Sequence, residues 1–330
     1  MKIMLGFLIK VKHELMLQKT YLLEALHFWK LIVKYNASHH TDDDLQKMQY
    51  TLLRESHTIE KGMSMRNPRE GFGQQKVINL IGRLKGYCKL YILQDSTFLD
   101  YPLSIIKTYI EYTQDRGIKI PEINKSFADL LVLANRKSVN SKAGVMSVTK
   151  EDILAKCNSD FESLLYSRHS IRYFSEKPIN IDVLNKALEL AQHTPSACNR
   201  QGWLTHIYLA QKSINLIKWQ GGCRGFEDEI KCSILVTANL KAFLSYEIHQ
   251  AYVDGGLYAM NLINALHSLG LGTIPLSCGF DYKHLEKLSG FDIPDYEVPI
   301  VIIGVGNLLE EFNVAVSERK SINFTNKIHI

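Results

Sequence analysis

The chain has 330 residues, of which 46% are hydrophobic, so it can bury a full core and wholesale disorder is excluded. Its formal net charge is +5, and no run of five basic residues occurs, which argues against a partner nucleic acid. Six cysteines are scattered without a C-x-x-C pair or zinc-ligand spacing. We therefore expect a cytoplasmic protein in a reducing compartment, with no metal site.

The first 36 residues are rich in apolar side chains. Charged residues interrupt them at Lys10, Lys12, Glu14 and Lys19, and the longest uncharged run is far short of the roughly 18–20 residues that a membrane span needs. We expect an amphipathic helix near 12–35, and neither a membrane span nor a signal peptide. Its apolar face needs a partner. A protein surface is our first interpretation, and contact with a membrane surface is the alternative.

The remainder of the first 150 residues has mostly helical patterns. Acidic residues at 42–44 suit the start of a helix over 42–60, and glycines with a proline predict a loop over 61–73. Helical patterns return at 74–94 and 101–116. Residues 135–150 are polar without a strong period, which predicts a linker.

The second half alternates between strands and helices. A helix is predicted over 180–193 and a long, nearly uncharged one over 247–269; strands are predicted over 204–210, 232–238 and 298–306. There is no regular βαβ repetition, so the fold class is α+β. The stretch "IIGVGN" lacks the third glycine and the following helix of a dinucleotide fingerprint. The long helix is expected at the centre of the fold or at a subunit interface.

The stretch "SRHSIRYF" (167–174) places Arg168 and Arg172 around Ser170. If the stretch is helical, the two arginines lie one turn apart on a solvated face. Alternatively, two guanidinium forks and a hydroxyl form a site for a phosphate or another anion. The residues of this stretch alone leave both interpretations open.

Four motifs follow one another in the second half: "RHSIR" (168–172), "TPSACNRQGW" (194–203), "LGLGTIPLSCGF" (269–280), and "VPIVIIGVGN" with the tail "SERKS" (298–321). Their order resembles that of the nitroreductase family of FMN-dependent oxidoreductases, over about residues 155–330. The resemblance implies a nitroreductase-like α+β fold, with an antiparallel-rich central sheet flanked by helices, over 151–330. Residues 1–150 then form a mostly helical N-terminal extension. The resemblance also implies a homodimer, because sites of this family are built from two chains.

The resemblance implies roles for particular residues. Arg168 and Ser170 bind the FMN phosphate, joined by Arg319 of the basic tail, and Arg172 lies near the ribityl chain or pyrimidine edge, where a fixed cation stabilises reduced flavin. The second motif approaches the flavin from the partner subunit, and the backbone of the third faces the flavin edge near N5. The implied cofactor-binding residues are Arg168, His169, Ser170, Arg172, Pro195, Ser196, Asn199, Gln201, Pro275, Leu276, Ser277 and Arg319. No catalytic side chain is expected, because the flavin carries the chemistry.

Two residues depart from the family pattern in the second motif. Gly202 stands where the family has proline, which should loosen the loop, and Cys198 lies inside the motif. Whether Cys198 or Cys278 is reactive stays open. Separately, "HTIEKG" (57–62) is similar to a segment in a subgroup of nitroreductase-like proteins, often encoded among surface-polysaccharide genes. His57 and Glu60 either form an acid/base cluster with Lys61, or these residues cap helices and form ion pairs on a surface.

The predicted activity is that NADH or NADPH reduces bound FMN, which then reduces a small-molecule acceptor. The acceptor is a nitroaromatic, a quinone or an unsaturated intermediate. The alternative function is a scaffold in surface-polysaccharide biosynthesis, flavin-bearing or flavin-free, with little redox turnover. The two functions differ in whether a nicotinamide cofactor bleaches the purified protein.

Overall fold

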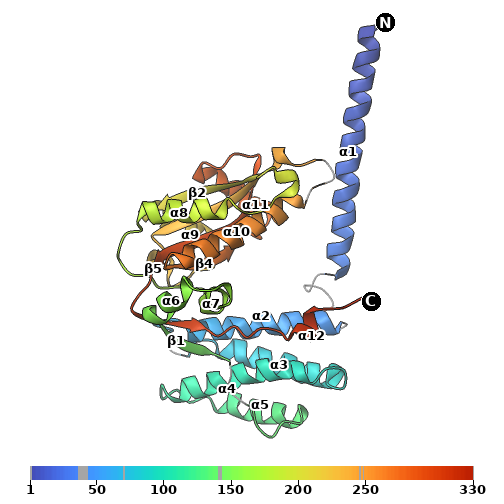
Figure 1. Ribbon diagram of the computed structural model, residues 1–330. Coiled ribbons are helices and arrows are strands. Elements are labelled where there is room, and N and C mark those ends of the chain that lie inside the picture. Colours follow the sequence, from blue (N-terminus) through green and yellow to red (C-terminus); the bar gives the residue numbers. More distant parts are fainter. Residues whose placement is uncertain are drawn as a thin grey trace. The chain divides into compact units, whose positions relative to one another are not determined.

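The computed structural model describes residues 2–35, 44–69, 71–139, 143–244, 247 and 249–329. The chain divides into two compact units (Figure 1). A sheet unit comprises Val148–Phe312 together with Met1–Trp29, and a helical unit comprises Lys30–Ser147 together with Asn313–Ile330. The predicted domain boundary at residue 150 lies close to the division between Ser147 and Val148, whereas residues 1–29 group with the sheet unit. The last 18 residues, assigned above to the second domain, group with the helical unit.

The helical unit is built from α2 (Leu45–Met63), α3 (Gln74–Tyr91), α4 (Asp100–Gln114) and α5 (Pro121–Leu133), with the short η2 (Thr97–Leu99) and α12 (Ile322–Thr325). Leu52, Leu84 and Ile106 are fully buried in its core. The Asp44 side chain accepts a hydrogen bond from the Lys47 N–H at 2.9 Å and so caps α2. The predicted acidic start of this helix is confirmed at Asp44, and residues 42 and 43 lie outside the described residues.

Three details of the helical unit differ from the sequence predictions. Residues 61–63 continue α2, so the predicted loop begins three residues later. Helix α5 was not predicted, although Ile123, Phe127 and Leu130 share its buried face. The end of the predicted linker forms β1 (Val145–Thr149), which pairs with β6 (Glu311–Ala315) in a two-stranded sheet. Backbone pairing with a distant segment stabilises this strand, and local composition does not reveal such pairing.

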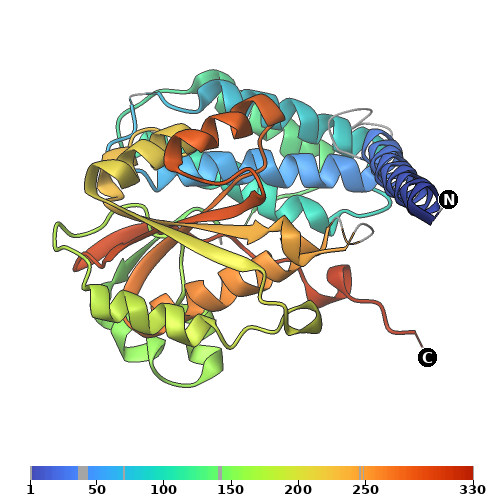
Figure 2. The same cartoon turned by 90° about the horizontal axis from the view of Figure 1, so that it is seen from above.

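The sheet unit contains a four-stranded sheet in the order β2 (Trp203–Leu209), β3 (Cys232–Asn239), β5 (Glu297–Asn307), β4 (Leu271–Ser277), and every neighbouring pair is antiparallel. Helices α8 (Ile181–Ala191) and α10 (Gln250–Ser268) cover one face, and α9 (Ala210–Gln220) covers the other (Figure 2). Strand β3 is buried on both faces because helices cover both. Shorter elements are α6 (Lys150–Cys157), α7 (Phe161–Ser167), η3 (Ala197–Asn199), η4 (Glu227–Glu229), η5 (Leu240–Ala242), α11 (Tyr282–Leu285) and η6 (Glu286–Phe291).

The predicted α+β class with an antiparallel sheet is confirmed. The predicted helices over 180–193 and 247–269 and the three predicted strands agree with α8, α10, β2, β3 and β5 to within a few residues. Strand β4 was not predicted, because Pro275 and two glycines obscure its pattern; it lies at the edge of the sheet, where proline is tolerated.

Helix α1 (Lys2–Tyr35) is the longest described helix. None of the described helices combines the length and the apolarity that crossing a bilayer requires. The described residues also hold no group of three or more His, Cys, Asp or Glu side chains placed to bind a metal ion.

Candidate cofactor site

The stretch that carries the two arginines is extended. Helix α7 ends at Ser167, and Arg168 has a φ of −80° and a ψ of 122°. Ser170 forms a parallel bridge with Thr273 of β4, and the Ile171 N–H donates to the Thr273 carbonyl at 2.9 Å. The helix-face interpretation is therefore wrong. In an extended chain alternate side chains share a side, so Arg168, Ser170 and Arg172 are expected on the same side.

Two buried side chains fasten this stretch to the sheet. Ile171 is 1% exposed and Phe174 is 5% exposed. A Cβ atom on Gly272 of β4 would lie 3.0 Å from Ile171 Cδ1, and one on Gly306 of β5 would lie 2.3 Å from the Phe174 ring. Both glycines are needed because these side chains occupy the space that a Cβ atom would fill. Gly306, the second glycine of "IIGVGN", is therefore required for the close packing of Phe174 against β5.

Positive charge gathers where α10 ends. The Nε2 atom of His267 lies 2.9 Å from Ser167 Oγ, and the side chain is 2% exposed. Burial, followed by the charges of Arg168 and His169, lowers the pKa of His267 to about 4. His267 is therefore neutral at pH 7, and Arg168 carries a permanent charge near it. His267 was not singled out from the sequence, where it is one position in an apolar helix.

A second group missed by the sequence analysis is the hydroxyl of Thr273. Thr273 is 2% exposed, and its Oγ1 atom has no hydrogen-bond partner among the described residues. Its backbone pairs with Ser170, so two hydroxyl groups accompany the arginine-bearing stretch. A buried hydroxyl without a partner costs free energy, so this edge of the sheet suits a ligand that offers hydrogen bonds.

The second motif forms a tightly shaped loop. The Ser196 hydroxyl oxygen accepts a hydrogen bond from the Gln201 N–H at 2.9 Å, and the Gln201 amide donates to Asn199 Oδ1 at 3.1 Å. Cys198, Asn199 and Gln201 have φ values of 51°, 54° and 49°, a left-handed conformation that is uncommon for residues other than glycine. Pro195, Asn199 and Gln201 are exposed. Such backbone conformations concentrate at functional sites.

Gly202 does not loosen this loop as expected. It is buried, and its carbonyl oxygen accepts a hydrogen bond from the Asn239 N–H at 2.7 Å. A Cβ atom there would lie 3.0 Å from Ala242 and Phe243, so the close packing against η5 favours glycine at this position.

Within one chain, the first motif (168–172) lies beside the third (269–280), whereas the second (194–203) lies apart from both. Ala197 donates its N–H to the buried Asp254 carboxylate at 3.2 Å, whereas Arg168 lies close to His267. Asp254 and His267 belong to the same helix, α10, and are 13 positions apart (267 − 254). At 1.5 Å per residue these attachment points are separated by about 20 Å.

The third motif lies on the open edge of the sheet. Pro275 and Ser277 are exposed and Leu276 is buried. The Gln220 amide donates to the Ser277 carbonyl oxygen at 3.1 Å. Cys278 is 8% exposed, and burial raises its pKa to about 12, so its thiol is protonated at neutral pH. Of the two cysteines considered above, only Cys198 is exposed.

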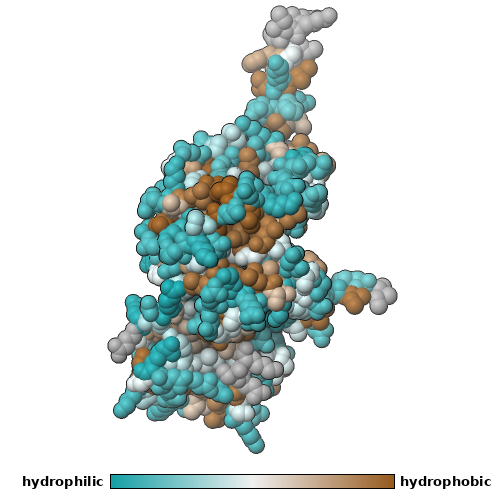
Figure 3. All heavy atoms as spheres, turned by 60° about the vertical axis from the view of Figure 1, so that its left-hand side comes forward, coloured by the Kyte–Doolittle hydropathy of each residue, from teal (hydrophilic) through white to brown (hydrophobic). Residues whose placement is uncertain are grey.

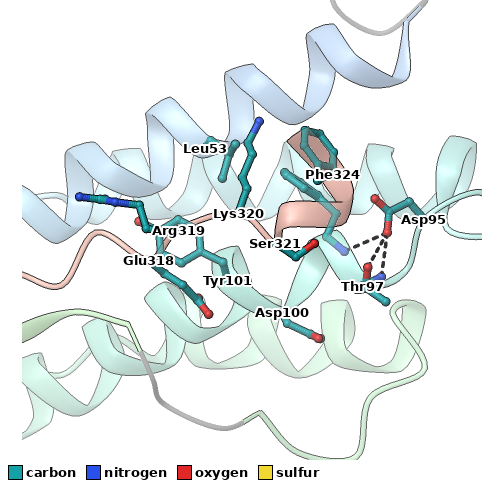
Figure 4. Close-up of a pocket in the computed structure, with 11 residues that line it drawn as sticks. Leu53, Asp95, Thr97, Asp100, Tyr101, Glu318, Arg319, Lys320, Ser321 and Phe324 are labelled. Carbon is teal, nitrogen blue, oxygen red and sulfur yellow. Dashed lines mark hydrogen bonds between the residues drawn. The ribbon is translucent and has the colours of Figure 1, made fainter. Parts of the chain in front are cut away.

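Arg319 belongs to the helical unit. It lines a cavity of about 280 Å³ (Figure 4), and its Nη1 atom donates to the Ser317 carbonyl oxygen at 2.5 Å. The other lining residues are Leu53, Asp95, Thr97, Phe98, Asp100, Tyr101, Glu318, Lys320, Ser321 and Phe324. The role of Arg319 in phosphate binding stays a prediction.

Glu60 holds the helical unit together. Its side chain is fully buried, and its carboxylate accepts hydrogen bonds from Gly144 N–H at 3.1 Å, Ser317 N–H at 3.2 Å and Tyr101 OH at 3.2 Å. His57 Nδ1 lies 3.2 Å from the same carboxylate. Burial, and then Glu60, raises the pKa of Tyr101. This geometry fits a structural role for the residues of "HTIEKG" better than it fits an acid/base cluster.

Residues 165–247 and 245–307 match the model of the Nitroreductase family. The resemblance carried by the four motifs is thus confirmed over less than half of the chain, inside the sheet unit. Three solved structures are similar. A nitroreductase-like protein from Streptococcus mutans is 21% identical over 52% of this chain and 98% of that chain, with a TM-score of 0.45.

The second is a predicted nitroreductase in complex with FMN from Exiguobacterium sibiricum, 17% identical over 52% of this chain and 98% of that chain, with a TM-score of 0.45. The third is a predicted NAD(P)H:FMN oxidoreductase from Staphylococcus epidermidis, 18% identical over 52% of this chain and 96% of that chain, with a TM-score of 0.44. The sheet unit has a nitroreductase-like fold, preceded by a helical extension.

Proposed function

Since residues 165–307 match the Nitroreductase family, we propose that this chain is an FMN-dependent oxidoreductase. NADH or NADPH reduces the flavin, and a nitroaromatic, quinone or unsaturated intermediate is then reduced. One observation carries the proposal: the bridge between Ser170 and Thr273 fixes the arginine-bearing stretch beside the open edge strand of the sheet. A phosphate group and an aromatic ring system can then be held by adjoining parts of one edge.

The residues present fit the phosphate of FMN. Arg168 and Ser170 are half-buried on alternate positions of an extended stretch, and the Thr273 hydroxyl adds an unused donor. Charged hydrogen bonds from a guanidinium are suited to phosphate oxygens. Arg172 is only 5% exposed, so its charge is fixed in place. FMN, when bound, would supply the hydride chemistry, and a fixed cation stabilises its reduced, negatively charged form.

The edge strand indicates which backbone group faces the ring. The N–H and C=O of one strand residue point the same way, and successive residues alternate between the two edges. The Thr273 carbonyl accepts from Ile171 and the Ser277 carbonyl accepts from Gln220, so both residues direct their backbone groups away from β5. Pro275, between them, has no N–H. We therefore assign the ring-facing donor on this edge to the Ser277 N–H.

The second motif would be supplied by a second copy of the chain. Helix α10 exposes four large apolar side chains on one face: Tyr252 (51%), Val253 (51%), Leu257 (48%) and Met260 (42%). Such a stripe favours an interface. Antiparallel pairing of α10 with the α10 of another copy would cover the stripe. It would also bring the partner's 196–201 loop towards the Arg168 end of the helix.

The test is a visible absorption spectrum of the purified protein reconstituted with FMN, recorded without oxygen. We expect a bound-flavin spectrum that NADH or NADPH bleaches and that a quinone restores. A protein that binds FMN but is bleached by neither nicotinamide would contradict the proposed activity. That result would favour the scaffold function in surface-polysaccharide biosynthesis.

A further inference from the structure

Helix α1 exposes large apolar side chains along its described length. Leu8 is 56% exposed, Leu15 65%, Leu22 61% and Trp29 59%. Seven more large hydrophobic side chains of the helix are exposed: Phe7, Ile9, Val11, Met16, Tyr21, Leu23 and Leu26. Hydrophobic side chains (brown) interrupt the hydrophilic ones (teal) on α1 in Figure 3. So many exposed large apolar side chains on one helix indicate a partner.

The spacing of these side chains identifies the kind of partner. Leu8, Leu15, Leu22 and Trp29 recur every seven residues. Val11, Gln18 and Ala25 follow the first three of these by three residues, so the series fills position a of four heptads and position d of three. Apolar a and d positions sustained over three to four heptads are typical of a coiled coil. Gln18 is the single polar residue among these a and d positions.

The charges beside this seam are complementary between two copies. With Leu8 and Leu15 at a, Glu14 takes position g and Lys19 position e of the next heptad. In a parallel coiled coil, g of one strand faces e of the next heptad in the other strand. Glu14 therefore meets Lys19 of the second copy twice, once on each side. In an antiparallel pair g faces g and e faces e, and this complementarity is lost.

We propose that α1 pairs with the α1 of a second copy as a parallel, in-register two-stranded coiled coil. Charges of opposite sign flank the seam, with Lys12 and Lys19 on one side and Glu14 on the other. A helix that lies on an anionic lipid surface typically has lysines along its polar face. This pairing uses the apolar seam of α1, whereas the pairing proposed above uses the apolar stripe of α10. It does not depend on flavin binding.

Disulfide formation in the full chain tests the pairing. The background is Cys198→Ser, because Cys198 is the exposed cysteine and the other five are buried. In register, position a of one strand faces the same residue of the other, so Leu15→Cys should oxidise to a covalent dimer. His13→Cys, two residues away at position f, points outward and should not form a covalent dimer. Val11→Cys, at d, should link like Leu15→Cys and removes less apolar volume.

Equal linking of the Leu15→Cys and His13→Cys variants would overturn the proposal, because it would show random collision. A folded Leu15→Cys or Val11→Cys protein that never links would overturn it too. So would a variant that does not link but sediments with phosphatidylserine vesicles, since lipid would then be the occupant.

Charge reversal supplies a second readout. Glu14→Lys should slow disulfide linking of the Leu15→Cys protein by about fivefold, because two ion pairs are lost and lysines then face each other. Adding Lys19→Glu to the same chain should restore the rate, because each pair is then re-formed with its signs exchanged. Failure of the double reversal to restore linking would refute the parallel register.

Discussion

Replacing Gly306 by alanine should loosen the stretch that carries the arginines. The added Cβ atom would lie 2.3 Å from Phe174 Cγ and Cδ1 and 2.6 Å from Phe174 Cβ. Because the Phe174 Cβ atom is fixed to the main chain, no rotamer of the ring relieves the clash, and the 168–174 stretch or β5 must move. Overpacking of this kind costs about 1–3 kcal/mol, and we expect the upper end of that range.

The assay is urea unfolding followed by tryptophan fluorescence, because Trp203 and Trp219 both belong to the sheet unit. Gly306→Ala should lower the free energy of unfolding by about 3 kcal/mol and weaken FMN binding by about tenfold or more. The control is Gly290→Ala, where no atom lies within 4 Å of the new Cβ, so the free energy should change by less than about 0.5 kcal/mol. If Gly306→Ala is as stable as this control, Phe174 does not anchor the stretch.

Three further variants test other parts of the structure. The pKa of His267 is about 4 in the folded protein, so between about pH 6.5 and pH 4 the unfolded chain binds a proton that the folded chain does not. The free energy of unfolding should therefore be full above about pH 6.5 and fall by up to about 1.4 kcal/mol per pH unit towards pH 4. In urea titrations His267→Gln should remove this part of the pH dependence, and an unchanged profile would exclude His267 as its source. Glu60→Gln should cost about 1.5–3 kcal/mol in chemical unfolding, whereas Glu111→Gln, which only breaks an exposed pair with Lys107, should cost less than about 1 kcal/mol; equal losses would show that the Glu60 contacts are unimportant. Gly82→Ala, in an open position of α3, should raise stability by about 0.5–1 kcal/mol in thermal unfolding, and a decrease would contradict the packing described there.

Hydrophobic periodicity was sufficient to predict the longest helices and three of the six described strands. The buried face of α8 and the apolar runs of β3 and β5 are properties of the local sequence. Strand β4 is not: its proline and glycines obscure a strand pattern, and only its place at the sheet edge makes proline acceptable. Helix α9 was missed as well, since its pattern is short and follows directly on a strand.

The candidate site was predictable in composition but not in geometry. Arg168 and Arg172 were recognised, yet their separation by four residues equally suggested a helix, and pairing of Ser170 with Thr273 decides otherwise. Pairing across 103 residues (273 − 170) cannot be inferred from local spacing. The left-handed backbone at Gln201 accompanies a hydrogen bond from its N–H to Ser196 Oγ within the folded loop, and residue propensity favours another conformation there.

The most direct test of the phosphate assignment compares two ligands that differ only in that group, FMN and riboflavin, titrated into the wild-type protein and Arg168→Ala. Arg168→Ala should weaken FMN binding by about 1.5–3 kcal/mol, roughly 10- to 150-fold, because a charged hydrogen bond to phosphate is lost. Riboflavin binding should be unchanged, and Arg54→Ala, an exposed arginine of α2, should alter neither affinity. An equal loss for both ligands, or no loss for FMN, would contradict the assignment of Arg168 to the phosphate.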